Sequence, residues 1–203
     1  MKVTSALALV ICSVGFFSAI PAAHAQSGWQ IASAVPDPAS ILTIGTGSMP
    51  TTVVFTAGTV TSSATASSTG SQHTGDTNPS AYQFSEVVTY TWMGKGPSVP
   101  FHVSVTPTAT ASANSAPYTL CSSSSSASTQ PGNVTATANA SGGTLSGNNN
   151  PGSYPLPLNS GGVSTASLRL NLSAQASGNV YVSGHLYSCA SSAIVSLGAP
   201  TVP

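Results

Sequence analysis

Charged residues are almost absent from this sequence. Of its 203 residues, three are Lys or Arg and three are Asp or Glu, so 3% of the chain is charged, whereas about a quarter of an ordinary domain is charged. Nucleic-acid binding depends on Lys and Arg that neutralise phosphates, and a calcium site depends on several carboxylates. The composition therefore argues against nucleic acid as a partner and against a resident metal or other cofactor.

The same scarcity limits catalysis, because an enzyme needs titratable groups that converge on one site. Only Asp37, Asp76 and Glu86 are available for the carboxylate pair of a glycosidase. Asp37 lies between prolines and Asp76 in a Gly/Thr-rich stretch, where an Asp ordinarily caps a turn. We expect Glu86 to open a strand and to be solvated or paired with Lys95 or Arg169. We therefore predict no enzymatic activity, and the enzymatic alternative is a weak activity centred on Glu86 or Asp76.

The histidines do not follow a metal-binding pattern. His73 and Asp76 share a polar stretch, whereas His102 and His185 each stand within an expected strand. A zinc site built from His73, Asp76 and one strand histidine is the alternative that the sequence leaves open, but this spacing is not that of a zinc motif. No metal ligand is predicted.

Cysteine is also scarce, with three in the chain. Cys12 lies in the apolar N-terminal stretch, which leaves Cys121 and Cys189. Neither belongs to a Cys-x-x-Cys motif or has a neighbouring base, so a reactive thiol lacks support. In an exported protein such a pair is expected to form a disulfide, which stabilises the fold by roughly 4 kcal/mol on the chain-entropy model.

The N-terminus has the pattern of a secretion signal. Lys2 is followed by an apolar stretch and by Ala23 and Ala25 at the positions that a signal peptidase requires. We expect residues 1–25 to be removed and the protein to be exported to the periplasm, the cell surface or the medium of a bacterium. The apolar stretch is too short for a comfortable membrane span, so no transmembrane segment is expected after cleavage; an uncleaved anchor is the alternative.

Alternating apolar residues dominate residues 86–107. Val88, Tyr90 and Trp92 share one face of an expected strand, and Phe101, Val103 and Val105 share one face of the next. This period of two is typical of half-buried strands. The connection contains Gly94 and Gly96, and it predicts a β-hairpin at the centre of an all-β domain.

Similar segments, separated by Gly and Pro, give about nine short antiparallel strands over residues 26–203. They predict one β-sandwich domain of immunoglobulin-like or fibronectin-like architecture; a jelly roll or an open β-barrel is the alternative. Residues 122–126 are expected to be a flexible polar link, and residues 176–179 a turn between the last strands. Residues 141–162 have no periodicity and are expected to form a flexible loop.

Aromatic residues are the features from which a sugar-binding platform would be built. Most of them lie in expected strands, where the core is their ordinary place. Tyr154 is the exception, because it stands between Ser153 and Pro155 in the expected loop. It is therefore the candidate ligand-contact aromatic.

Two functions from different classes remain after these exclusions. The first is a structural or adhesive role at the cell surface or in an extracellular matrix. Few charges are available to block strand pairing, so self-association through sheet edges is expected. The second is a carbohydrate-binding module whose partner is a polysaccharide and whose contact residue is Tyr154.

Overall fold

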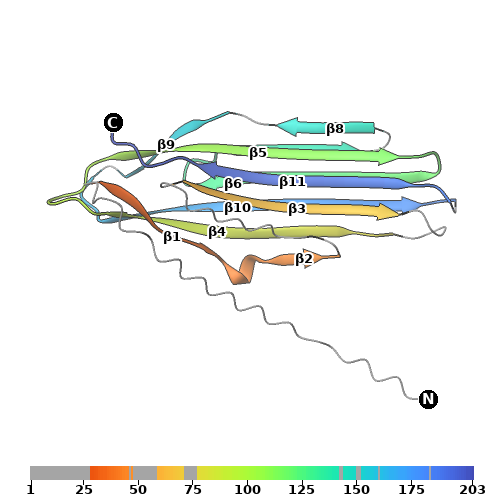
Figure 1. The fold of residues 1–203 in the computed structure, drawn as a ribbon, viewed down its shortest axis with the longest axis horizontal. Coiled ribbons are helices and arrows are strands. Elements are labelled where there is room, and N and C mark those ends of the chain that lie inside the picture. The colour runs from red at the N-terminus through yellow and green to blue at the C-terminus, as the bar shows by residue number, and fades with distance from the viewer. Residues whose placement is uncertain are drawn as a thin grey trace, which may run out of the picture.

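The computed structural model describes residues 28–45, 47, 59–70, 77–141, 144–149, 152–159, 161–182 and 184–203, with the backbone alone for residues 70 and 144–149. These residues form eleven strands in two antiparallel sheets, and one short 3-10 helix, η1 (Pro38–Ser40). The predicted β-sandwich is confirmed (Figure 1). None of the described residues belongs to a helix that is long and apolar enough to cross a membrane. The predicted signal peptide lies outside the described residues.

Sheet A has the strand order β1, β4, β10, β6, β7, and β2 also pairs with β4. The bounds of its strands are β1 (Trp29–Pro36), β2 (Leu42–Ile44), β4 (Ser80–Trp92), β6 (Thr119–Gln130), β7 (Thr135–Ser141) and β10 (Thr165–Val180). Sheet B has the order β3, β11, β5, β8, and β9 also pairs with β5. Its strands are β3 (Val60–Gly70), β5 (Phe101–Ser115), β8 (Thr144–Asn149), β9 (Tyr154–Asn159) and β11 (Tyr187–Leu197).

The predicted hairpin at residues 86–107 is wrong, although both of its strands exist. β4 pairs with β1 and β10 in sheet A, whereas β5 pairs with β11 in sheet B. The connection between them therefore crosses from one sheet to the other. An alternating pattern fixes which side chains face the core, but it is the same whether consecutive strands pair or face each other across the core.

Three predicted irregular segments are strand. The expected loop at residues 141–162 contains β8 and β9, which both pair with β5. Pro155 and Pro157 made β9 unrecognisable as a strand in the sequence. They are tolerated there because β9 is an edge strand. The expected link at residues 122–126 lies within β6, and the expected turn at residues 176–179 lies within β10, which is continuous for 16 residues.

The core changes in character along the strands. One half holds the large side chains, with Tyr90, Phe101 and Leu168 fully buried. The other half holds mostly Ala and Ser, so the sheets lie close enough for side chains to reach the facing backbone. Ser125 Oγ donates a hydrogen bond to the carbonyl oxygen of Thr110 at 2.8 Å, and Ser191 Oγ donates one to that of Gln175 at 2.8 Å.

Candidate functional site

Glu86 is not a solvated or ion-paired residue at a strand start. It lies within β4, is fully buried in the core, and accepts a hydrogen bond from Ser62 Oγ through Oε2. Burial raises the pKa of its carboxyl group, and the hydrogen bond from Ser62 opposes this only in part. No described residue hydrogen-bonds to Oε1. Glu86 is therefore sealed from any substrate, and the enzymatic alternative loses this residue as its centre.

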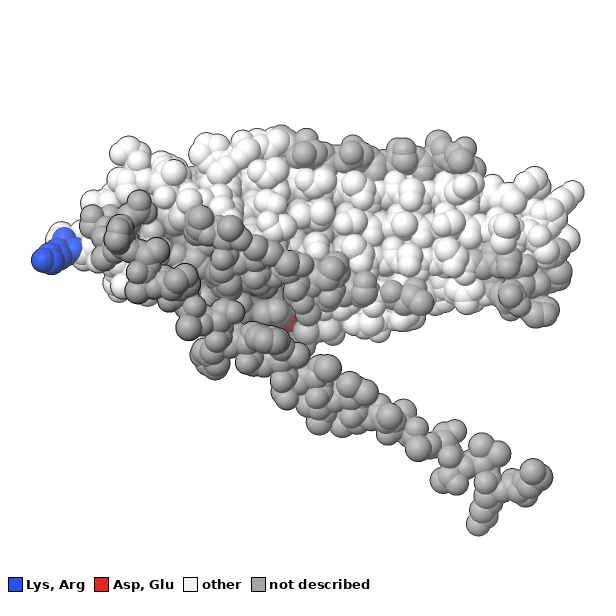
Figure 2. Space-filling view, in the orientation of Figure 1, with Lys and Arg blue, Asp and Glu red and all other residues white. Residues whose placement is uncertain are grey.

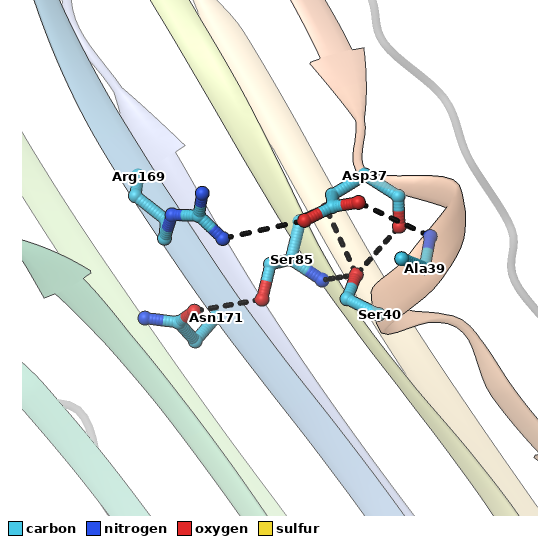
Figure 3. Close-up of polar contacts among 6 residues, drawn as sticks. All are labelled: Asp37, Ala39, Ser40, Ser85, Arg169 and Asn171. Carbon is cyan, nitrogen blue, oxygen red and sulfur yellow. Dashed lines mark hydrogen bonds and ion pairs between the residues drawn. The ribbon is translucent and has the colours of Figure 1, made fainter.

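Arg169, one of the two cations predicted as a partner for Glu86, pairs elsewhere. Arg169 Nη1 lies 3.5 Å from Asp37 Oδ2 on the outer face of sheet A, where both side chains are partly exposed (Figure 3). Asp37 also caps η1, since its Oδ1 accepts a hydrogen bond from Ala39 N at 3.1 Å. The expected capping role of Asp37 is thereby confirmed. Beside the pair, Ser85 Oγ donates to Asn171 Oδ1 at 2.8 Å (Figure 3).

The histidines that the structure describes do not converge. His102 lies near the start of β5, where its backbone N–H donates a hydrogen bond to the carbonyl oxygen of Thr201 at 2.8 Å. His185 lies in the turn between β10 and β11, and not within a strand as expected. These positions are at opposite ends of the sandwich, so the two side chains cannot share one metal ion. His73 and Asp76, the other members of the alternative zinc site, lie outside the described residues.

Cys121 and Cys189 form the expected disulfide, with a Cα–Cα distance of 5.8 Å. Cys121 is in β6 and Cys189 is in β11, so the bond joins sheet A to sheet B. It lies next to the turns that precede these two strands. The disulfide therefore braces one end of the sandwich.

Tyr154 does not stand in a loop. It is the first residue of β9, pairs with Val105 of β5, and is 42% exposed at the sheet edge. Because Leu156 and Pro155 are its neighbours along the strand, it has no second exposed aromatic beside it in β9. Tyr154 alone therefore does not form a platform.

Exposed aromatic residues gather instead at the end of the sandwich that the disulfide braces. We name Tyr118, Leu120, Tyr181, His185 and Leu186 the aromatic tip. Tyr181 N donates to Tyr118 O at 2.8 Å, which joins the two turns, and the rings of Tyr118 and His185 lie 5.3 Å apart. Tyr118 has a φ of 63°, a left-handed conformation that costs a non-glycine residue roughly 1–2 kcal/mol.

The outer face of sheet A is hollowed by two adjoining grooves of 520 Å³ and 440 Å³. Both run over β10 and β6: Gln175 and Ser124 line the first, and Ser173 and Ser126 the second. We name them together the sheet A groove. The second groove is lined mainly by hydroxyl and amide groups. The first groove also has Leu42 and Ile44 of β2, Pro79 and Ala81 in its lining, and it exposes more apolar than polar surface.

Among the residues that the structure describes, few charged side chains lie on either broad face. On sheet A, Arg169 and Asp37 neutralise each other at the margin of the groove. Figure 2 looks onto the sheet B side, where the Lys and Arg atoms in view lie at one end of the molecule. The described surfaces therefore expose mainly hydroxyl, amide, aromatic and aliphatic groups.

Sequence reasoning missed the aromatic tip and the sheet A groove. Tyr118 and Tyr181 are among the aromatic residues that the sequence places in expected strands, yet they lie in the turns before β6 and after β10. No protein-family model matches this chain, and a comparison with curated proteins finds no significant similarity. The chemistry of these two surfaces is thus the basis on which a function can be proposed.

Proposed function

We propose that this chain is a non-enzymatic bacterial protein, exported by its N-terminal signal peptide, with an adhesive or structural role at the cell surface or in an extracellular matrix. The observation that supports the proposal best is the aromatic tip. Tyr118, Leu120 and Leu186 are 63%, 52% and 66% exposed there. A contiguous exposed apolar patch ordinarily marks a surface that contacts another surface.

The tip is built to keep its shape. Ala116 N donates to Leu186 O at 3.1 Å, and Thr119 Oγ1 donates to Ala116 O at 2.8 Å. The Cys121–Cys189 disulfide holds the two strands behind the turns. A preorganised contact surface loses little conformational entropy on binding, and backbone strain of the kind seen at Tyr118 is often stored at functional sites.

In the structural version of this proposal, copies of the chain associate with one another through a sheet edge. β7 pairs with β6 along one side, and its sequence TATANAS has no charged residue and no proline. Natural edge strands are usually blocked by Lys, Pro or a bulge. We expect the edge of β7 to accept an antiparallel strand from a second copy.

The test is adsorption of the mature chain to methyl-terminated and hydroxyl-terminated monolayers on a quartz crystal microbalance. Tyr118→Ser with Leu186→Ser is expected to reduce adsorption severalfold, because it removes the apolar contact surface without touching the core. Leu42→Ser with Ile44→Ser is the matched control, since these side chains are similarly exposed at 47% and 42% but lie on β2. Equal adsorption of both variants would refute the role of the tip.

Light scattering of the same proteins tests the assembly. The mature chain is expected to form large species that Thr137→Lys, in the middle of β7, disperses. A monomer at all concentrations would exclude self-assembly and leave adhesion to a foreign surface. If the assemblies still form with Thr137→Lys, the contact between copies does not involve the edge of β7.

A carbohydrate-binding module is the second candidate function. The contact residue predicted for it, Tyr154, has no neighbouring exposed aromatic on its strand. The observation that favours it is the sheet A groove, whose rows of hydroxyl and amide groups and apolar patch at one end match the hydroxyl groups and the C–H surface of a sugar chain.

A further inference from the structure

The two parts of the sheet A groove follow one another along β6 and β10. They meet between Gln175 and Ser173 of β10 and between Ser124 and Ser126 of β6, which are successive outward positions. From Ser122 to Gln130 the outward face of β6 spans eight residue steps, or roughly 26 Å at about 3.3 Å per residue. The groove is therefore long enough for an extended chain rather than a single small ligand.

Strand register places the polar groups of the groove in rows. Gln175 pairs with Ser124, which pairs with Asn139 of β7. One step along the strands, Ser173 pairs with both Gln83 of β4 and Ser126. Neighbouring strands lie about 4.8 Å apart and successive outward residues about 6.6 Å apart. A hydroxyl or an amide thus recurs at short, regular intervals across and along the face.

The next row contains an amide with a fixed position. Asn171 pairs with Ser85 and with Ser128 across the sheet. The hydrogen bond from Ser85 Oγ to Asn171 Oδ1, at 2.8 Å, holds the amide group in one orientation (Figure 3). Amides and hydroxyls both donate and accept hydrogen bonds, which is also true of sugar hydroxyl groups.

We propose that the sheet A groove binds a neutral polysaccharide chain lying along β6 and β10. This inference rests on the second candidate function and names its ligand class and its site. Rows of donors and acceptors meet the hydroxyls of successive sugar units, while Leu42 and Ile44 offer an apolar edge to one end of the chain. The Arg169–Asp37 pair is neutral as a unit, so the groove does not select an ionised sugar.

Other occupants fit this groove less well. An anionic polysaccharide or a nucleic acid needs unpaired cations. The described residues that line the groove include no Lys or Arg, and Arg169 beside it is paired with Asp37. A second copy of the chain would bury a face rich in Ser, a residue depleted from protein interfaces. A peptide strand pairs with a sheet edge, whereas the groove lies on the face.

The test is isothermal titration calorimetry of the full mature chain with dextran, laminarin, galactomannan and hydroxyethylcellulose, and with alginate as the anionic comparison. We expect at least one neutral polymer to bind and alginate not to bind. Ser126→Arg places a long side chain in the middle of the groove and is expected to weaken binding by about tenfold or more, as several hydrogen bonds are lost. Gln175→Ala is expected to weaken it by a few-fold.

The matched control is Thr108→Arg, an outward residue of β5 on the opposite face. It is expected to bind like the wild type, with unchanged Trp fluorescence and far-ultraviolet circular dichroism in every variant. No binding of any neutral polymer would overturn the proposal, as would equal weakening by Thr108→Arg and Ser126→Arg. If Tyr118→Ser loses binding while Ser126→Arg binds fully, the polysaccharide binds at the aromatic tip and not in the groove. If the wild-type protein is a dimer and Ser126→Arg makes it a monomer, the outer face of sheet A binds a second copy of the chain, and the proposal is wrong.

Discussion

Replacing Glu86 by Gln should remove most of the pH dependence of folding. Glu86 is fully buried, and the desolvation of its carboxyl group raises its pKa above the ordinary value of 4.5. The folded protein therefore keeps a proton that the unfolded chain releases above this pH. Gln has nearly the same shape and can still meet Ser62, but it does not titrate.

The sign follows from proton linkage. Stability that depends on protonated Glu86 is fully present below pH 4.5 and is lost as pH rises through the interval between the unfolded and folded pKa values. One proton gives a limiting slope of about 1.4 kcal/mol of unfolding free energy per pH unit. Above the folded pKa the carboxylate is ionised in both states, and the slope returns to zero. The wild type is thus expected to lose stability from pH 4.5 upward, and Glu86→Gln to lose little.

The assay is denaturation by guanidinium chloride, followed through Trp29, at pH 4 to 8. Trp29 is buried and stacks on Phe101 with ring centroids 4.3 Å apart, so its fluorescence reports the core. The chain holds three acidic residues and four histidines, and the titration of the groups other than Glu86 is common to both proteins and cancels in their difference. The difference in unfolding free energy between Glu86→Gln and the wild type should rise as pH increases above 4.5 and level off once the folded pKa is passed.

Asp37→Asn is the control, since it makes the same chemical change at a partly exposed ion pair. It should alter stability by no more than about 1 kcal/mol at any of these pH values. A constant difference between Glu86→Gln and the wild type from pH 4 to 8 would refute the reasoning. That result would mean that Glu86 has the same pKa in the folded and unfolded chains.

Two further predictions concern the braced end of the sandwich. Cys121→Ala with Cys189→Ala should lower the unfolding free energy by about 4 kcal/mol, because the disulfide closes a loop with a sequence separation of 68; an unchanged denaturation midpoint would contradict a bond between these residues. Gly178→Ala should cost about 1–3 kcal/mol, because a Cβ at this position of β10 would overlap the ring of Tyr187. Gly28→Ala is its control, as a Cβ there meets nothing within 4 Å, and equal thermal midpoints for the two variants would exclude the close approach.

Side-chain alternation made the fold class predictable. Wherever large apolar and small polar residues alternate, as in Val103 and Ser104, the inward set could be read from the sequence. The residues expected on the inward faces of β4 and β5 are buried, apart from Trp92, which is partly buried. The disulfide followed from elimination among three cysteines. Strand pairing did not follow, because β4 and β5 bury the same faces whether they pair within one sheet or face each other from two.

Glu86 was misplaced for a different reason. It occupies the inward position between Phe84 and Val88, so the alternation itself assigned it to the core. The expectation of a solvated or ion-paired residue came from placing Glu86 at the start of its strand, whereas an isolated buried carboxylate carries a large desolvation cost. That cost is smaller when the carboxyl group is protonated and accepts a hydrogen bond from Ser62. Ser62 lies on β3 of the facing sheet, so the sequence alone does not show this contact.

The sheet A groove was hidden by the uniformity of its own residues. In the run Ser122–Ser126 the same side chain occupies inward and outward positions, so no period of two can appear in the sequence. Pairing with β10 resolves the ambiguity: Ser124 is outward in the groove, whereas Ser125 is inward and bonded to Thr110 of the facing sheet. Serine is small enough for the thin half of the core and polar enough for the outer face. A single residue type therefore serves both surfaces of β6, and its role at each position is set by the strands around it.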